Sequence, residues 1–385
     1  MSGSSFGSIF TISTFGESHG AGLGVVVDGC PAGIPLDELV IQKELDRRRP
    51  GQHGNEFNAA ITSRKEADHC QILSGVFNGR TTGTPIAIMI PNTSQQSKDY
   101  ATLKDTYRPG HADFTYSQKY GFRDHRGGGR SSGRETAARV AAAAVAKAFL
   151  ASRYPLRERE EGEGHDGALH SSISVTAFTL RAAGISCQNI DLSVIEENPL
   201  RAADAKAAKA MAERIDQLRR QGDSAGGIIQ CRVTGVPAGL GEPVFDKLDA
   251  ELAKAMLSIG AVKGIEFGVG FGCADLTGST MNDNMHVQTN ENGTVDVRFA
   301  TNNAGGILGG ISNGNDILFN LAIKPVPSIS KEQKTVALDD GIYKDTILSV
   351  HGRHDVCLCP RIVPVVEAMT WLTLADMSLR QERMR

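Results

Sequence analysis

An alanine-rich stretch in the first half of the chain constrains the fold more than any other feature. Alanine fills nine of the 20 positions from 132 to 151. Alanine is the strongest helix former, and its small side chain lets neighbouring elements approach a helix closely from several sides. We therefore expect a central helix over 132–151, covered by strands and other helices.

The residues at the start of this helix have the character of an anion site. Gly127-Gly128-Gly129 precede it, and Ser132 and Glu135 have the spacing of a capping box. Glycines let backbone N–H groups crowd around a ligand, and a helix start carries partial positive charge. Five arginines with planar, fork-shaped guanidinium groups stand in or beside this segment: Arg123, Arg126, Arg130, Arg134 and Arg139. The segment predicts a site for a phosphorylated ligand; the alternative is an ordinary capped helix with solvated arginines.

Length and composition limit the class of protein. The 385 residues show no break in composition that would mark a linker, so we expect one domain over 1–385. A net charge of −3 argues against a nucleic-acid-binding protein. Seven cysteines, an odd number, and no apolar run at the N-terminus fit a protein of the reducing cytoplasm. We expect no segment to span a membrane. We interpret Cys357-Leu358-Cys359 as two reduced thiols, because no second pair of Cys or His ligands stands at the spacing of a zinc site.

Apolar periodicity predicts the other elements. We expect strands at 8–14, 23–27 and 265–271 and helices at 36–49 and 245–258. On the second of these helices Phe245 should share one face with Leu248 and Leu252.

Three further segments are defined by glycine or charge. The glycine-rich turn 16–22 between the first two strands carries His19. Residues 157–167 are charged, broken by glycine and have nothing to bury, which is typical of a mobile surface insertion. The glycines of 302–315 indicate a backbone that either packs tightly or approaches a flat ligand.

Histidine stands beside acid or arginine in three short, glycine-flanked motifs. They are Gly-Glu-Ser-His-Gly at 16–20, Arg-Pro-Gly-His-Ala-Asp at 108–113 and Gly-Arg-His-Asp at 352–355. Each alone is more typical of a structural histidine, but three together with the arginine-rich helix start favour one convergent site. The pattern indicates acid–base chemistry on an anionic substrate.

These segments resemble the signature regions of the chorismate synthase family. The matching stretches occur in the family's order at 15–20, 46–51, 108–139, 352–355 and 364–369, and the resemblance extends from residue 6 to about residue 375. It implies an α/β fold of the α+β type, a layered sandwich of antiparallel sheets enclosing central helices, and a homotetramer.

The resemblance also implies a reaction. Members of this family eliminate phosphate from 5-enolpyruvylshikimate 3-phosphate in a 1,4 process that gives chorismate, the last step of the shikimate pathway in aromatic amino-acid biosynthesis. Reduced FMN is required although no net redox change occurs. The chain has no added flavin-reductase domain, so we expect an external source of reduced flavin, with NADPH involved only indirectly.

Roles for individual residues follow from the same resemblance. The implied catalytic residues are His19, which protonates the leaving phosphate, His111, near the flavin N1 region, and Asp355, a proton relay from N5. The implied substrate-binding residues are Arg48, Arg49, Arg134 and Arg353, and Arg48 is also a candidate contact for NADP. The implied flavin contacts are Arg130, Ser131, Ser132, Gly260, Ala261, Gly309, Lys324, Pro325, Val326, Pro327, Ser328 and Arg353. No metal is implied.

The chain departs from the family pattern at three places. Gly54 stands where some members have an arginine linked to a nicotinamide cofactor, which weakens the NADP hypothesis. Gly260 replaces a frequent asparagine, and 324–328 reads Lys-Pro-Val-Pro-Ser instead of Lys-Pro-Thr-Ser-Ser. The lost hydroxyl groups remove hydrogen bonds that a flavin would otherwise receive.

Two other functions are compatible with the same residues. One is a metal-dependent phosphoester hydrolase with ligands among His19, His111, Asp113, His354 and Asp355, although they lack a ligand-spacing motif and the arginines would repel a cation. The other is a flavin- or phosphate-binding module without catalysis, in which the loop histidines have no task.

Overall fold

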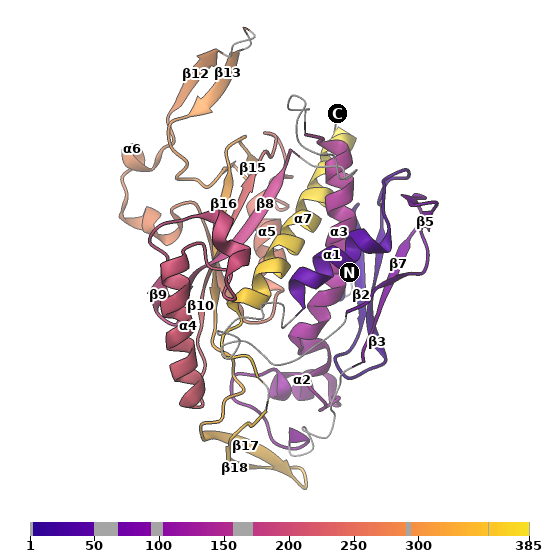
Figure 1. Ribbon diagram of the computed structural model, residues 1–385, viewed down its shortest axis with the longest axis vertical. Helices are drawn as coiled ribbons and strands as arrows, with labels where there is room; N and C mark the ends of the chain where they lie inside the picture. The colour runs from indigo at the N-terminus through magenta and orange to yellow at the C-terminus, as the bar shows by residue number, and fades with distance from the viewer. Residues whose placement is uncertain are drawn as a thin grey trace.

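Two antiparallel sheets enclose a double layer of helices (Figure 1). The computed structural model describes residues 3–49, 68–93, 103–156, 172–289, 293, 295–352 and 354–384. The first sheet has the order β1 (Ser5–Phe6), β2 (Thr11–Gly16), β3 (Gly22–Asp28), β7 (Ile86–Pro91) and β4 (Gln71–Ile72). The second has the order β11 (Val262–Phe267), β16 (Ile317–Ile323), β10 (Gly227–Thr234), β8 (Ser174–Ala182) and β9 (Ile185–Ser186).

The helical layer joins the two sheets through one buried core. Helix α3 (Thr136–Arg153) packs on β3 and β7 of the first sheet, and α7 (Cys359–Met384) packs on β8 and β10 of the second. The two helices pack against each other, with α1 (Glu38–Arg48) beside α3 and α5 (Leu248–Leu257) beside α7. Buried apolar side chains from both sheets and all four helices form one cluster. The predicted sandwich of antiparallel sheets around central helices is therefore confirmed.

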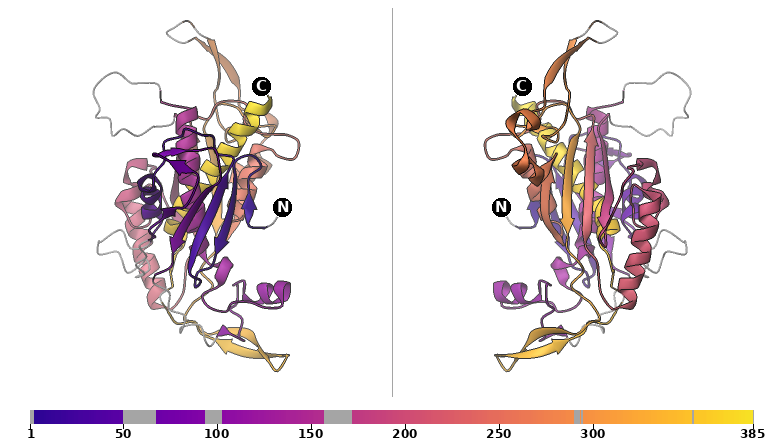
Figure 2. Two further views of the ribbon diagram at one scale, coloured as in Figure 1. Left: turned by 90° about the vertical axis from the view of Figure 1, so that its right-hand side faces the viewer. Right: turned by 90° about the vertical axis from the view of Figure 1, so that its left-hand side faces the viewer.

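The remaining elements lie at the ends and edges of this sandwich. They are β5 (Val76–Phe77), β6 (Arg80–Thr81), α2 (Asp113–Tyr120), α4 (Ala205–Arg220), α6 (Gly278–Met281), β12 (Met285–Thr289), β13 (Val295–Phe299), β14 (Ile307–Leu308), β15 (Ile311–Ser312), β17 (Gln333–Asp339) and β18 (Ile342–Leu348). Short 3-10 turns cover Gly129–Ser131, Gly133–Glu135, Leu192–Glu197 and Gly270–Asp275. Figure 2 shows the β12–β13 and β17–β18 hairpins projecting from opposite ends of the molecule.

The alanine-rich segment is the central helix that its composition predicts, but it begins differently. Ser132 caps the 3-10 turn before α3, accepting a hydrogen bond of 3.3 Å from the Arg134 N–H. Glu135 does not close a capping box; its carboxylate pairs with Arg139 at 3.0 Å instead. The predicted capping box is wrong because an arginine one turn later offers the carboxylate a charged donor.

Helix α7 corrects the expectation that no segment resembles a membrane span. It is long and apolar enough to cross a bilayer, yet its most apolar 18-residue window is entirely buried inside the protein. Its two buried acidic residues have internal partners. Glu367 accepts hydrogen bonds from Arg47 at 2.6 Å and the Ala177 N–H at 2.9 Å. Asp376 accepts three from the N–H groups of residues 8, 9 and 10, at 2.6–3.0 Å. The helix is thus a core element that also fixes the start of the chain.

The other predicted elements differ from the structure mainly at their ends. The helix at 245–258 begins only at Leu248, and Phe245 is 91% exposed, so it does not share the buried face. The strand at 265–271 ends at Phe267 because Gly268 and Gly270, with φ of +56° and +58°, turn the chain. In 302–315, Gly305 lies against the backbone of Gly268, so of the two alternatives the glycines here provide tight packing.

Three features singled out in the sequence lie outside the described residues. They are the charged insertion 157–167, Gly54 and Arg353. The predictions for them stay predictions.

Candidate active site

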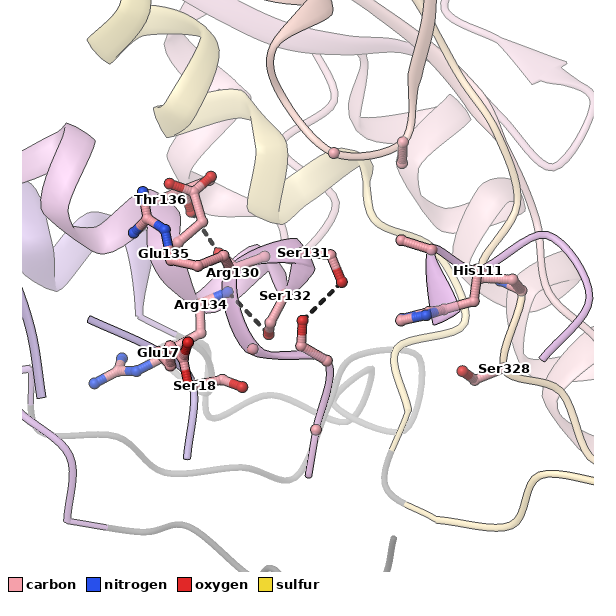
Figure 3. Close-up of a pocket in the computed structure, with 18 of the residues that line it drawn as sticks. Glu17, Ser18, His111, Arg130, Ser131, Ser132, Arg134, Glu135, Thr136 and Ser328 are labelled. Atoms are coloured by element: carbon pink, nitrogen blue, oxygen red, sulfur yellow. Dashed lines mark hydrogen bonds between the residues drawn. The ribbon is translucent and has the colours of Figure 1, made fainter. Parts of the chain in front are cut away.

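A cavity of about 1120 Å³ opens where α3 and α7 begin, beside α2. It gathers most of the residues predicted for the site, from segments far apart in the sequence. Those that line it are His19, Arg48, His111, Arg130, Ser131, Ser132, Arg134, Gly260, Ala261, Lys324, Val326, Pro327, Ser328 and Asp355. In Figure 3, Glu17, Ser18 and Arg134 lie on one side and His111 and Ser328 on the other, with Ser131 and Ser132 between them.

Three predicted residues do not line this cavity. Arg49 follows the last residue of α1 and pairs with Asp46 at 3.4 Å on the surface, where both side chains are more than one-third exposed. Gly309 lies in the β14–β15 hairpin beside α5, and Pro325 packs near Gly226. The geometry of this chain therefore gives no support to ligand contacts by Arg49, Gly309 or Pro325.

The triple glycine makes room for both predicted catalytic histidines. Gly127 has φ +69°, and a Cβ atom there would lie 2.0 Å from Cε1 of His19. A Cβ atom at Gly128, with φ +106°, would lie 3.3 Å from Cε1 of His111. Side chains are excluded at Gly127 by both the backbone conformation and the His19 ring. The glycines thus bring two loops, each carrying one histidine, to the start of α3.

A buried carboxylate orients His111. Asp113 Oδ1 lies 2.8 Å from His111 Nδ1, and Arg108 makes a bidentate contact with the same carboxylate at 2.7 and 2.8 Å. Burial by itself would raise the pKa of Asp113, but hydrogen bonds from Arg108 and His111 outweigh it and hold that pKa well below its usual range. An ionised Asp113 accepts a hydrogen bond from His111 Nδ1, which therefore carries a proton. Nε2 of His111 is then the nitrogen that remains to exchange a proton.

A second buried carboxylate joins two arginines. Asp68 is 2% exposed and contacts Arg48 Nη1 at 3.3 Å and Arg134 Nη1 at a short distance. Arg48 also donates to Thr136 Oγ1 at 3.1 Å and to the Gly133 carbonyl at 2.9 Å. Both guanidinium groups are therefore fixed at the helix start before any ligand arrives.

Arg130 is held by neutral groups. Its guanidinium donates to the carbonyl and hydroxyl oxygens of Thr14, at 3.2 and 2.7 Å, and to the Gly16 carbonyl at 3.3 Å. Within the described part of the chain it makes no ion pair. Its charge is accordingly available to an anion in the cavity.

Arg139 ties the helical layer to the segment that carries Gly260 and Ala261. It donates to Ser258 Oγ at 2.6 Å and to the Ser258 carbonyl at 3.2 Å, while Glu135 balances its charge. A Cβ atom at Gly260 would have no neighbour within 4 Å, so the backbone here faces open space.

Asp355 presents an unpaired oxygen. Its Oδ2 pairs with Arg361 at 2.7 Å, but Oδ1 is buried and has no hydrogen-bond partner among the residues that the structure describes. Since a buried carboxylate oxygen without a donor is costly, this atom is suited to a ligand that brings a hydrogen-bond donor.

Positive charge predominates in the lining. The described cations are Arg48, Arg108, Arg123, Arg130, Arg134, Arg139, Lys324 and Arg361, and the described carboxylates are Glu17, Asp124, Glu135 and Asp355. Burial, followed by repulsion from Lys263, lowers the pKa of Lys324. This balance favours a ligand with several negative charges.

Sequence reasoning missed two residues of this site. Asp68 and Asn92 carry no motif, and each acts on a residue far away in the sequence. The sequence shows Asp113 only as an acid two residues after His111, whereas its contact with Arg108 defines its role.

The cysteines form no disulfide, and burial raises the pKa of several of their thiols. All seven are unpaired, and six are buried. Burial raises the pKa of Cys30 to about 12, and of Cys70 and Cys187 to about 11.

Comparisons with known proteins agree over the whole chain. The family model described as "Chorismate synthase" matches residues 10–379. The chain is 52% identical over 384 residues to a "Chorismate synthase" of Oleidesulfovibrio alaskensis, covering 100% of this chain and 99% of the relative. It is 50% identical over 390 residues to a "Chorismate synthase" of Methanosarcina mazei, with coverage of 99% and 97%. A solved structure titled "Crystal Structure of Chorismate Synthase" superposes with a TM-score of 0.70 at 28% identity, covering 97% of this chain and 93% of that one.

Proposed function

Because this chain belongs to the chorismate synthase family, whose members are carbon–oxygen lyases, we propose that it eliminates phosphate from 5-enolpyruvylshikimate 3-phosphate to form chorismate. This is the last step of the shikimate pathway in aromatic amino-acid biosynthesis. The observation that carries the proposal is the single cavity in which fixed arginines, two loop histidines and an unpaired carboxylate oxygen meet.

The substrate suits the charge of this cavity. It has two carboxylates and a phosphate, and Arg48, Arg134 and Arg130 offer guanidinium groups already held in place. Fixed donors stabilise the charge that grows on the departing phosphate without reorganising during the reaction. We assign Arg48 and Arg134 to substrate binding, and Arg353 on the family resemblance alone.

The cavity also suits a flavin beside the substrate. A volume of about 1120 Å³ lies above the roughly 300–1,000 Å³ usual for one small-molecule site. Gly260 faces open space, and the buried Oδ1 of Asp355 lacks a donor. When bound, reduced FMN would supply electron density to the substrate without a net redox change. Arg130, Ser131, Ser132, Gly260, Ala261, Lys324, Val326, Pro327 and Ser328 would hold it.

The histidines and Asp355 handle protons in this proposal. His19, whose ring lies against Gly127, gives a proton to the leaving phosphate. His111, with Nδ1 fixed by Asp113, uses Nε2 to compensate negative charge on the other side of the site. Asp355 accepts a proton at Oδ1, the oxygen that has no partner. His111 and Asp355 thus each act at one stated atom.

The setting of the enzyme follows from the same resemblance. It acts in the cytoplasm, which the seven unpaired cysteines support. An external source supplies reduced flavin, with NADPH acting only indirectly. Arg48, the candidate contact for NADP, is only 3% exposed and therefore suits a small anion better than a dinucleotide. The enzyme is a homotetramer, a proposal supported by exposed apolar side chains on the β12–β13 hairpin at Met285, Val287, Val295 and Val297.

Anaerobic conversion of 5-enolpyruvylshikimate 3-phosphate with chemically reduced FMN, and without nicotinamide, tests this proposal. We expect chorismate and phosphate in equal amounts, and no product with oxidised FMN. Phosphate without chorismate, or product without flavin, would overturn it and favour a hydrolase. That alternative lacks a ligand set within the described residues, where no three His, Cys, Asp or Glu side chains are grouped to hold a metal ion.

A further inference from the structure

Asn92 connects the loop that carries His19 to the start of the central helix. It follows β7, and its backbone N–H donates to the Ala21 carbonyl at 3.0 Å. Its side-chain Nδ2 donates to the carbonyls of Glu17, at 2.9 Å, and Gly20, at 3.0 Å. These two carbonyls lie on either side of His19, so one amide group holds both ends of the turn in which that histidine stands.

The other end of the same amide contacts Arg134. Asn92 Oδ1 accepts a hydrogen bond of 3.2 Å from Arg134 Nε. The orientation of the amide is fixed by its partners, because carbonyls can only accept and a guanidinium can only donate. Both N–H groups and the oxygen are therefore used, and each contact joins the His19 turn or Arg134.

We propose that Asn92 is a positioning residue for the reaction, keeping His19 in register with Arg134. This inference rests on the proposed function, in which His19 protonates the phosphate and Arg134 binds the substrate. The turn contains Gly16, Gly20 and Gly22, whose backbones are conformationally permissive, so a clamp between residues 17 and 20 limits motion that the sequence would otherwise allow. A misplacement of about 1 Å at a reacting group costs on the order of 100-fold in rate.

Two substitutions separate the two halves of the clamp. Asn92→Asp keeps an acceptor for Arg134 but loses both donors to the turn, whereas Asn92→Ala loses all three side-chain hydrogen bonds. We expect kcat to fall roughly 10- to 100-fold in both variants. KM should rise in both variants, because Asn92→Asp places a negative charge beside Arg134 in a cavity that binds an anion, and Asn92→Ala removes a partner of Arg134.

The chain offers a matched control in Asn198. Its amide also clamps a loop, donating to the carbonyls of Val194 and Ala202 at 2.8 Å each and accepting from the Ala202 N–H at 3.0 Å. It does not line the cavity. Asn198→Ala should lower thermal stability as much as Asn92→Ala does, while leaving kcat within about 2-fold of wild type.

A readout independent of turnover separates this inference from the proposed function. The rate of carbethoxylation of each histidine by diethyl pyrocarbonate, followed by peptide mass spectrometry, reports the exposure of His19 directly. We expect His19 to react at least about 3-fold faster in both Asn92 variants than in wild type or Asn198→Ala, with His111 unchanged. Unchanged His19 reactivity would overturn the inference even if the wild type makes no chorismate. If chorismate forms, a kcat in Asn92→Ala equal to that of Asn198→Ala would overturn it as well.

Discussion

Two buried aspartates organise the cavity in the same way but for different partners. Asp68 joins Arg48 to Arg134, whereas Asp113 joins Arg108 to His111. Both carboxylates are at most 3% exposed. Asp68 contacts two arginines, and Asp113 contacts His111, Arg108 and, at 3.7 Å, Arg123. Arginine stays protonated, so the first cluster can only present fixed donors. An imidazole ring can both give and accept a proton, so the second cluster can take part in proton transfer. The same device thus serves binding in one place and proton handling in the other.

The largest effect should follow from removing an arginine of the Asp68 cluster. Arg134→Met keeps much of the side-chain volume but leaves Asp68 with one arginine fewer and removes a cavity donor. Truncating one partner of a buried charge pair costs roughly 2–5 kcal/mol. We expect kcat/KM to fall about 10²- to 10³-fold, mainly through KM, in anaerobic steady-state assays. Arg126→Met, at an exposed arginine paired with Asp124, is the control and should stay near wild type.

A smaller effect, on a different kinetic parameter, should follow from Asp113→Asn. Asparagine fits the space, but its amide can donate or accept a hydrogen bond and so can hold either tautomer of His111. The protonation of Nε2 is then no longer fixed by residue 113. Residues that orient a functional histidine typically contribute 10- to 100-fold. We expect kcat to fall roughly 10- to 100-fold with little change in KM, and the pH profile of kcat to shift. A rise in KM with unchanged kcat would mean that Asp113 supports binding instead.

Asp113 should also contribute to acid stability. Its folded-state pKa is well below the unfolded value of about 3.9, so its contribution is complete above about pH 4 and is lost as pH falls toward the folded pKa. We expect the difference in free energy of unfolding between wild type and Asp113→Asn to shrink from pH 5 to pH 3. Urea unfolding at several pH values measures it. A difference that stayed constant would show that the ionised carboxylate is not what stabilises the cluster.

The smallest effect should come from Arg49, despite its place beside Arg48 in the sequence. Its contact with Asp46 is exposed, and exposed ion pairs contribute about 0–1 kcal/mol. Arg49→Ala should leave kcat/KM within about 2-fold of wild type and stability within about 0.5 kcal/mol. A 10-fold loss of activity would instead place Arg49 at a ligand, against the geometry of this chain.

Local chemistry explains which parts of the fold the sequence predicts. The alanine-rich helix, the first two strands and α1 are predictable because periodicity and small side chains act within one element. The limits of the helix at 245–258 are not, since a turn closed by a hydrogen bond of 3.0 Å from the Glu242 N–H to the Asp246 carbonyl precedes Leu248 and leaves Phe245 outside the helix. The single-domain prediction stays a prediction, favoured by a core that both sheets share.

The residues of the site also divide into those that the sequence predicts and those that it does not. Motifs mark His19, His111 and the arginines at the helix start, and these do line one cavity. Asp68, by contrast, lies 66 residues from Arg134, and no pattern in the sequence links the two. Such supporting residues can be identified only from the folded structure, because their role depends on the side chains that they contact.

The division of labour between the two aspartates is tested most directly by measuring substrate binding and turnover separately. The dissociation constant of 5-enolpyruvylshikimate 3-phosphate, measured with oxidised FMN so that no turnover occurs, is compared with kcat for Arg134→Met and Asp113→Asn. We predict a dissociation constant raised at least about 100-fold in Arg134→Met and within about 3-fold of wild type in Asp113→Asn, which instead loses kcat. Equal weakening of substrate binding in both variants would contradict the assignment of one cluster to binding and the other to proton handling.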